Sequence, residues 1–361
     1  MAENPERKSK SISGMLSALI LCTATVVFSV CSLISGSSAE AAEHPVWQPL
    51  LRVHDRLSML LGNDRLGAVY ITEDRLLPYL AEPEADTVAA AAQTVNQYAA
   101  SAGSSVYMLA VPTSAGIYGD MLSDATPLTN EQQILRDFSS ALQEPVLWID
   151  AASWLSGERE YYIYYRTDPH WTGYGAFCVY RSAIRRLGFN SLGYDRFTVT
   201  HVPHDYYGDL AHQSHYYDIM PDSVDLYSSS ERIQPETVTA LRQDGNTPLP
   251  GYFLTELPAV KDEPEKVFAL ETEPVLRIET GNQSSKDLLL LTDRFGCSMI
   301  PFLMQHYRMI TAVNLPACGE MDWRALTAGS YSQILILCGT DAIAAQDGLQ
   351  TWLQTESEED T

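Results

Sequence analysis

Cysteine is scarce in this 361-residue sequence, and the few cysteines are far apart. Of the six, Cys22 and Cys31 lie within one apolar run, and no two cysteines form a Cys-x-x-Cys pair. This spacing argues against a zinc knuckle and against a disulfide-dense scaffold. The cysteines outside the apolar run are Cys178, Cys297, Cys318 and Cys338, and the sequence does not assign a disulfide among them.

Basic residues are also few. Lys and Arg together number 23 against 46 Asp and Glu, which gives a formal net charge of −23. An acidic surface repels phosphate backbones, so nucleic acid is not expected as a partner. The simplest role of this acidity is solubility, and the acidic tail at 355–361 is expected to be solvated.

One long apolar run stands near the N-terminus. Residues 1–13 form a basic tail that contains Arg7, Lys8 and Lys10, and the uncharged segment 14–36 follows. A helix of that length crosses a hydrocarbon layer of ~30 Å, and the preceding positive charge places the tail inside. Small residues at 37–41 also fit a signal-peptide cleavage site, but the run exceeds the usual apolar core of ~7–15 residues. We therefore expect a single-pass membrane anchor with the bulk of the chain extracytoplasmic, or a secreted protein if the segment is cleaved.

Short apolar runs alternate with helical patterns over 44–354. Such alternation predicts an α/β domain with a parallel sheet and helices on both faces. The segment 190–285 breaks the rhythm, so we predict an insertion of loops and short antiparallel strands there. The predicted strands are 68–71, 106–111, 146–149, 288–291, 309–313 and 334–337, and the predicted helices are 46–61, 86–100, 130–142, 173–187, 295–306 and 341–353.

Residues 166–172, Arg-Thr-Asp-Pro-His-Trp-Thr, combine a carboxylate and an imidazole at the entry to a helix. Pro169 stiffens the segment and biases Asp168 away from helix, and Thr172 is a good N-cap for the helix that follows. An Asp beside a His can hold a general base in one tautomer. The alternative is structural: Asp168 caps the helix and His170 is a buried histidine with its hydrogen bonds satisfied.

Residues 164–172 resemble the signature of the DHHW family of envelope proteins, which is related to the SGNH-like alginate O-acetyltransferases of the AlgX and AlgJ type. Weaker matches extend the resemblance over most of the extracytoplasmic part, at 61–71, 111–113, 208–210 and 292–303. The resemblance implies an SGNH-hydrolase-like fold. It also implies that Asp168 orients His170, and that His170 activates a serine which carries an acyl group to or from a sugar hydroxyl.

The expected serine is missing. Where the family has Asp-Ser-Tyr, this chain has Asp293, Arg294 and Phe295, and a guanidinium is not a nucleophile. Three readings stay open. In the first, the enzyme is degenerate. In the second, Ser298 or Cys297 replaces the nucleophile, although one helical turn (~5 Å) separates them from the expected position. In the third, Arg294 pairs with Asp168 or Asp293, or binds an anion. The first and third are compatible, and we favour the first.

Other candidate site residues surround this motif. Arg166, Trp171, Asp293 and Arg294 are predicted to contact substrate, with Trp171 stacking on a sugar ring. A histidine cluster comprises His201, His204, His212 and His215, and these residues are weak candidates for a metal site, since no evident helix carries them and polar loops explain them as well. No cofactor is expected.

Together these features predict an extracytoplasmic domain related to O-acetyltransferases or esterases of cell-envelope polysaccharide, impaired or inactive because of Arg294. The alternative is a non-catalytic protein that binds the glycan or assembles with a membrane-bound O-acyltransferase. A metal-dependent site at the histidine cluster is a third, less favoured possibility.

Overall fold

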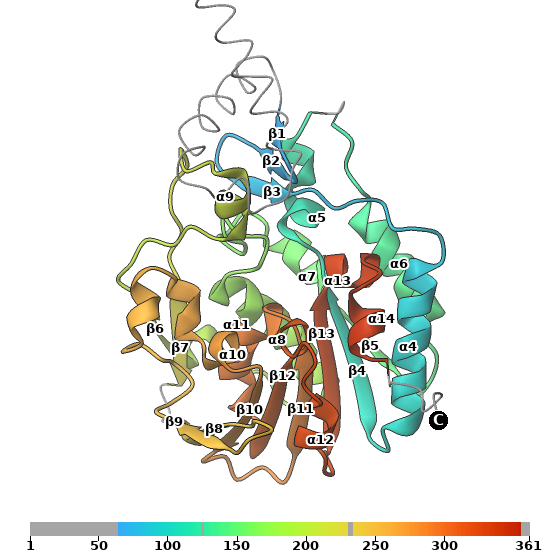
Figure 1. Ribbon diagram of the computed structural model, residues 1–361, viewed down its shortest axis with the longest axis vertical. Helices are drawn as coiled ribbons and strands as arrows, with labels where there is room; N and C mark the ends of the chain where they lie inside the picture. The colour runs from blue at the N-terminus through green and yellow to red at the C-terminus, as the bar shows by residue number, and fades with distance from the viewer. Residues whose placement is uncertain (1–63, 124–125, 230–233, 355–361) are drawn as a thin grey trace, which may run out of the picture.

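The computed structural model describes residues 64–123, 126–229 and 234–354, and its centre is an eight-stranded sheet (Figure 1). The strand order is β5 (Leu147–Asp150), β4 (Ser105–Val111), β13 (Gln333–Gly339), β11 (Asp287–Thr292), β12 (Met309–Asn314), β10 (Val275–Thr280), β8 (Pro235–Ala240) and β9 (Thr247–Leu249). The first five strands are parallel, and β10, β8 and β9 pair antiparallel beyond β12. The sheet is therefore mixed, which corrects the predicted all-parallel sheet.

The correction has a simple cause. The segment 190–285 contains short antiparallel strands, as its composition predicts, but three of them extend the main sheet: β10 pairs with β12, β8 with β10, and β9 with β8. An unpaired edge strand leaves a row of backbone donors and acceptors open, and the added strands satisfy them.

Apolar side chains cover both faces of the parallel strands. In β11, Leu288 and Leu290 pack into the larger core cluster, while Leu289 and Leu291 pack into the second cluster on the opposite face. Alternation across a strand produces this division, and burial on both faces explains why these strands read as unbroken apolar runs.

Helices form a layer on each face. The helices are α4 (Thr87–Ser101), α5 (Ser114–Tyr118), α6 (Glu131–Ala141), α7 (Ala152–Gly157), α8 (Gly173–Arg186), α9 (Asp209–Ser214), α10 (Ala269–Thr272), α11 (Phe295–Leu303), α12 (Trp323–Leu326), α13 (Thr340–Ala344) and α14 (Leu349–Trp352). Residues of α8 and α11 pack in the larger cluster, and residues of α4, α6 and α14 pack in the second. The predicted helix 341–353 is two short helices, and Gly348 stands at the N-cap of the second, where a Cβ would lie 2.0 Å from the Ala342 carbonyl oxygen.

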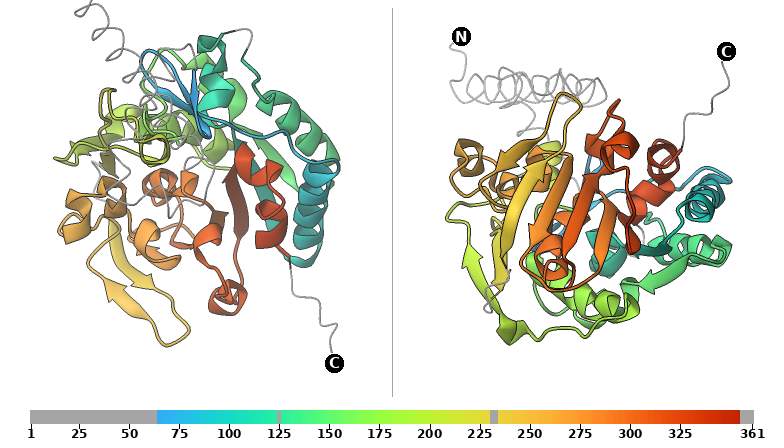
Figure 2. Two further views of the ribbon diagram at one scale, coloured as in Figure 1. Left: turned by 45° about the horizontal axis from the view of Figure 1, so that its top comes forward. Right: turned by 90° about the horizontal axis from the view of Figure 1, so that it is seen from below.

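Two small antiparallel sheets complete the fold. β1 (Arg65–Leu66), β2 (Val69–Ile71) and β3 (Leu76–Pro78) form one, and the left panel of Figure 2 shows it in blue beside α5 and α9. β6 (Phe197–His201) and β7 (Asp225–Ser229) form the other. The strand predicted at 68–71 therefore exists but lies outside the main sheet.

Two predictions fall on the N-terminal part of the chain. The helix at 46–61 and the anchor at 14–36 lie outside the described residues. Within the described ranges, no helix is both long and apolar enough to cross a bilayer.

Candidate active site

The candidate site lies at the carboxyl ends of the parallel strands, where ligands bind in open α/β sheets. Asp293 and Arg294 follow β11 directly, and α11 begins at Phe295. The Asp168–His170 segment reaches the same place from the loop before α8. That helix starts as predicted, because the Thr172 hydroxyl accepts a hydrogen bond from the Gly175 amide.

Asp168 and His170 form the predicted pair. Oδ1 of Asp168 lies 2.6 Å from Nδ1 of His170, and it also accepts the His170 amide at 2.9 Å. The contact fixes the imidazole so that Nε2 points away from the acid. Among the described residues, none donates a hydrogen bond to Nε2 or accepts one from it.

Burial and charge set the ionisation of the pair. Burial acts to raise the pKa of Asp168, but the positive charges of His170 and Arg294 outweigh it and hold that pKa well below its usual range. For His170, burial acts to lower the pKa, and the Asp168 carboxylate overcomes this, so the pKa of the imidazole is raised. Asp168 is therefore a buried anion that favours a protonated imidazole.

The second oxygen of Asp168 is also fully engaged. Oδ2 accepts hydrogen bonds from the Tyr206 hydroxyl at 2.7 Å and from the Asp209 amide at 3.2 Å. Gly208 lets the chain pass this close, since a Cβ there would lie 2.4 Å from the Asp168 Cβ. The segment 206–209 thus closes over the acid.

Aromatic packing holds the imidazole from the other side. The Phe295 ring lies against His170 with 4.6 Å between ring centroids, and Nε1 of Trp171 donates to the Phe295 carbonyl at 3.0 Å. Trp171 is 1% exposed. Trp171 was predicted to stack on a sugar; in this structure its ring packs in the core and positions Phe295 and His170.

Arg294 occupies the place of the expected nucleophile and turns its guanidinium toward acids. Nη1 lies 2.6 Å from Asp209 and 3.7 Å from Asp168, Nε donates to Glu271 at 3.1 Å, and Nη2 donates to the Tyr206 hydroxyl at 3.2 Å. The side chain is 23% exposed, so solvent screens these charges only in part. Of the pairings open in the sequence, the structure has the one with Asp168 and adds two acids.

Asp293 does not pair with Arg294. Its carboxylate accepts the Phe295 amide at 2.9 Å and the Gly339 amide at 2.8 Å, which ties the start of α11 to the end of β13. Burial and the nearby Asp341 carboxylate raise the pKa of Asp293 to about 6. The position predicted to bind substrate is instead a buried structural acid.

Little space remains beside His170. The His170 cavity measures about 30 Å³ and is lined by residues that include His170, Arg294, Cys297 and Ser298. A cavity of that size holds about one water molecule. An acetylated sugar is too large to enter this cavity as Arg294 is placed.

Neither alternative nucleophile is activated. Cys297 donates from Sγ to Glu271 at 3.2 Å, and burial and the charge of Glu271 raise the pKa of its thiol well above the ordinary value. Ser298 also lines the cavity, but no hydrogen bond joins it to His170 within the described residues.

Arg166 and the histidine cluster lie away from this cavity. Arg166 stacks over Tyr162 at 4.6 Å from the ring centroid and faces Asp222 at 3.9 Å, so it does not line the space beside His170. His201 pairs with Asp225 on the two-stranded sheet. Among the described residues, the predicted metal candidates His201, His204, His212 and His215 do not come together as ligands.

One other group has the spacing of a metal site. Ligand atoms of Asp168, His170 and Asp209 lie within 4.8 Å of one another. The guanidinium of Arg294 already contacts both acids and supplies the positive charge there. These residues therefore do not suit a cation as the chain stands.

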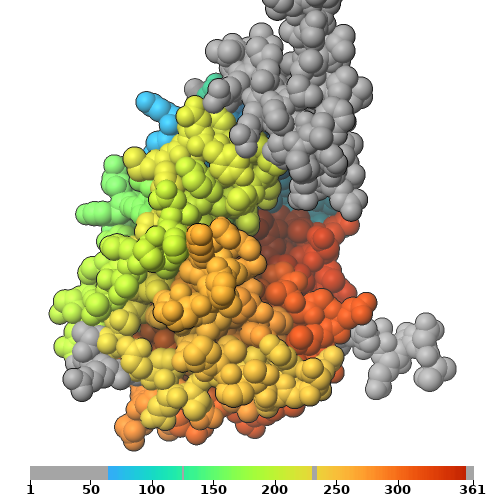
Figure 3. Space-filling view, turned by 60° about the vertical axis from the view of Figure 1, so that its left-hand side comes forward, coloured from blue at the N-terminus to red at the C-terminus, as the bar shows by residue number. Residues whose placement is uncertain are grey.

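Sequence reasoning missed the residues that hold Arg294. Glu271, Tyr206 and Glu265 come from the 190–285 segment and meet Arg294 or its cavity only through the fold. Figure 3 shows this segment, coloured yellow-green to orange, spread over one side of the molecule. No local pattern in the sequence marks these residues.

Comparison with known proteins gives consistent relatives. The family described as "SGNH hydrolase-like domain, acetyltransferase AlgX" matches residues 69–249. A DHHW family protein from Eubacterium siraeum superposes with a TM-score of 0.63 at 17% identity, covering 80% of this chain and 96% of that chain. Bacillus cereus PatB1 with a sulfonyl adduct superposes with a TM-score of 0.64 at 17% identity, covering 79% and 97%. Among curated proteins, none matches the sequence.

Proposed function

The chain belongs to the SGNH hydrolase-like acetyltransferase family of AlgX, and from that premise we propose that it is a member which has lost acyl transfer and serves the cell envelope as a non-catalytic glycan-binding domain. The observation that carries the proposal is the position of Arg294. The sequence resemblance puts Arg294 at the position of the nucleophilic serine, and in the structure its guanidinium contacts Asp168, Asp209 and Glu271.

The lost step is covalent. Acyl transfer in this fold requires an oxygen nucleophile whose proton passes to the imidazole while the acyl carbon is attacked. Arg294 carries no such oxygen and keeps its proton under all ordinary conditions. Removal of a nucleophile of this kind lowers turnover by about 10⁶-fold in a serine hydrolase, which leaves little more than background hydrolysis.

The remaining architecture supports a binding role. The fold, the Asp168–His170 pair and the aromatic packing around it are kept, and the small volume of the His170 cavity, about 30 Å³, argues against ester turnover inside it rather than against contact with a glycan at its mouth. We propose in addition that the apolar segment 14–36 anchors the chain and that the domain acts outside the membrane, because positive charge precedes that segment.

The test compares the full-length protein with its His170→Ala variant, using hydrolysis of an aryl acetate and acetyl transfer to a soluble oligosaccharide. We expect both proteins to give the same background rate. A rate in the unmodified protein at least tenfold above that of His170→Ala would overturn the proposal, because it would show that His170 activates another nucleophile. A cooperative thermal unfolding transition in the variant, at a midpoint close to that of the unmodified protein, serves as the folding control.

A further inference from the structure

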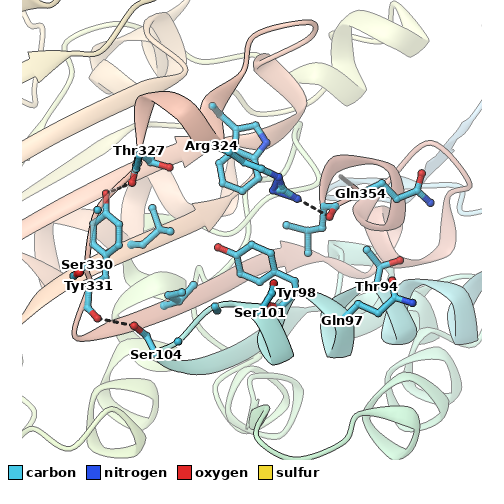
Figure 4. Close-up of a pocket in the computed structure, with 18 residues that line it drawn as sticks. Thr94, Gln97, Tyr98, Ser101, Ser104, Arg324, Thr327, Ser330, Tyr331 and Gln354 are labelled. Carbon is cyan, nitrogen blue, oxygen red and sulfur yellow. Dashed lines mark hydrogen bonds between the residues drawn. The ribbon is translucent and has the colours of Figure 1, made fainter. Parts of the chain in front are cut away.

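A groove of about 610 Å³ lies at the opposite end of the sheet from His170. Its lining comes from the carboxyl-terminal half of α4, the turn before β4, α12 with the loop after it, and the end of α14 (Figure 4). We propose that this groove, named here the Arg324 groove, binds an acidic saccharide, that is, a hydroxylated ring bearing a single carboxylate. Neither the family nor the proposed function assigns a site there.

Within the described residues, the cation in the groove forms no ion pair. Arg324 is the one charged residue in the lining, and within the described part of the chain no carboxylate lies within ion-pair distance of it. Its Nη2 donates to the Leu353 carbonyl at 2.7 Å, and the nearby Asp322 carboxylate caps α12 by accepting the Ala325 amide. Among residues 64–354 as described, no other hydrogen bond engages the guanidinium, which leaves its remaining donors to a ligand. A planar guanidinium binds a carboxylate through two parallel hydrogen bonds.

Two rings hold the guanidinium in place. Cζ of Arg324 lies 4.4 Å from the centroid of the Trp323 ring system and 5.6 Å from that of Tyr98. Figure 4 shows Tyr98 projecting into the middle of the groove below Arg324. Stacking fixes the orientation of the cation before a ligand arrives, which reduces the entropy lost on binding.

The rest of the lining suits hydroxyl groups rather than a purely apolar ligand. Hydroxyl and amide side chains surround the floor formed by Leu289 and Ile334, and they include Thr94, Gln97, Ser101, Ser104, Thr327 and Ser330. The Ser104 hydroxyl donates to the Tyr331 carbonyl and the Tyr331 hydroxyl donates to the Thr327 carbonyl, which orders the loop on that side. Polar groups around an aromatic face of this size are typical of a small-molecule site.

A single carboxylate fits the electrostatics better than a phosphate. The groove receives the carboxyl-terminal end of the 15-residue helix α4, whose partial charge is negative. The whole chain carries a net charge of −23, which further disfavours a single group that brings two negative charges to the one guanidinium, as a phosphate does. One guanidinium therefore balances one carboxylate, and a nucleotide is the less favoured occupant.

The test uses the full-length protein and isothermal titration calorimetry at low ionic strength. The probes are digalacturonate, the neutral disaccharide lactose, sodium acetate, inorganic phosphate and AMP. We expect digalacturonate to bind more tightly than each of the other four probes. Arg324→Gln is expected to weaken digalacturonate binding by about tenfold or more, and Tyr98→Ala to weaken it several-fold.

The matched control is Arg186→Gln, which removes an exposed arginine from α8, away from the groove. It is expected to leave digalacturonate binding unchanged. Arg324→Lys keeps the positive charge but lacks the planar array of donors. Weakened binding by a folded Arg324→Lys protein would therefore show that the guanidinium recognises the ligand, and that the loss is not due to unfolding. The proposal would be overturned if digalacturonate did not bind, if it bound no more tightly than lactose, or if Arg324→Gln left its affinity unchanged. Tighter binding of phosphate or AMP would overturn the proposed ligand class.

This result does not depend on the fate of the His170 site. An Arg294→Ser variant should bind digalacturonate as the unmodified protein does, because the groove shares no residue with the His170 cavity. Acetyl-ester turnover would overturn the proposed loss of catalysis and leave the groove intact, whereas failed titrations would overturn the groove alone.

Discussion

Oδ2 of Asp168 lies 3.7 Å from Nη1 of Arg294, so the acid that orients the imidazole also faces a fixed positive charge. The other oxygen of the same carboxylate contacts His170 at 2.6 Å. One buried acid is therefore shared between a general base and the residue that replaced its nucleophile.

Arg294→Ser should restore part of a catalytic site. The substitution supplies a hydroxyl at the nucleophile position and removes the side chain that fills the His170 cavity. We expect hydrolysis of an aryl acetate to rise at least tenfold above the unmodified protein, and to return to background in the double variant with His170→Ala. No gain in a folded Arg294→Ser protein would mean that further parts of the machinery are absent.

Arg294→Met should destabilise the fold. Removing one partner of a largely buried ion pair costs about 3–5 kcal/mol, because the remaining charges are left uncompensated. Arg294 faces Asp168, Asp209 and Glu271, so the free energy of unfolding measured with urea should fall by that order. The control is Arg308→Met, whose side chain is 58% exposed, and its loss should cost about 0–1 kcal/mol. Equal losses in the two variants would contradict the structural role of Arg294.

Gly208→Ala should separate Asp168 from His170. An added Cβ would lie 2.4 Å from the Asp168 Cβ and 2.6 Å from its Oδ2, so the carboxylate must shift. Because that carboxylate raises the pKa of His170, NMR titration of the imidazole should report a lower pKa in the variant. Gly157→Ala meets no atom within 4 Å and serves as the control. An unchanged titration of His170 in Gly208→Ala would show that the close approach does not control the pair.

Glu131→Gln should flatten the dependence of stability on pH. Burial raises the pKa of Glu131 from 4.5 to about 7 although Thr113 donates to it from its amide and hydroxyl. The folded state then binds the Glu131 proton more tightly than the unfolded state does, so stability is lost as pH rises from 4.5 to about 7. The raised pKa corresponds to roughly 3 kcal/mol.

Urea unfolding between pH 4.5 and pH 8 measures this effect. The unmodified protein should lose more stability over that range than Glu131→Gln does. Asp293, whose pKa is also raised, contributes equally to both proteins, so the difference between the two curves isolates Glu131. Parallel curves would show that Glu131 ionises in the folded protein as it does in the unfolded chain.

Local sequence alone determined several parts of this protein. Five of the six predicted strands lie in the main sheet. They could be predicted because strands buried in a sheet leave unbroken apolar runs in the sequence, whichever strands they pair with. The start of α8 at Thr172 and the contact between Asp168 and His170 were likewise predictable, since a cap and a two-residue spacing act over a few residues. The replacement of the expected serine by Arg294 could be inferred from the sequence motif alone.

Only the tertiary structure decided what Arg294 does and how much room remains beside it. Its partners Asp209 and Glu271 lie 85 and 23 residues away in the chain, and nothing local in the sequence brings their charges together. Trp171 looked like a sugar platform, and its burial depends on how α11 packs against α8. The mixed sheet likewise depends on tertiary structure, because which strand pairs with an edge strand is decided between segments that are distant in the sequence. Contacts across many residues depend on the whole packing arrangement, whereas caps, strands and motifs depend on their neighbours in the sequence.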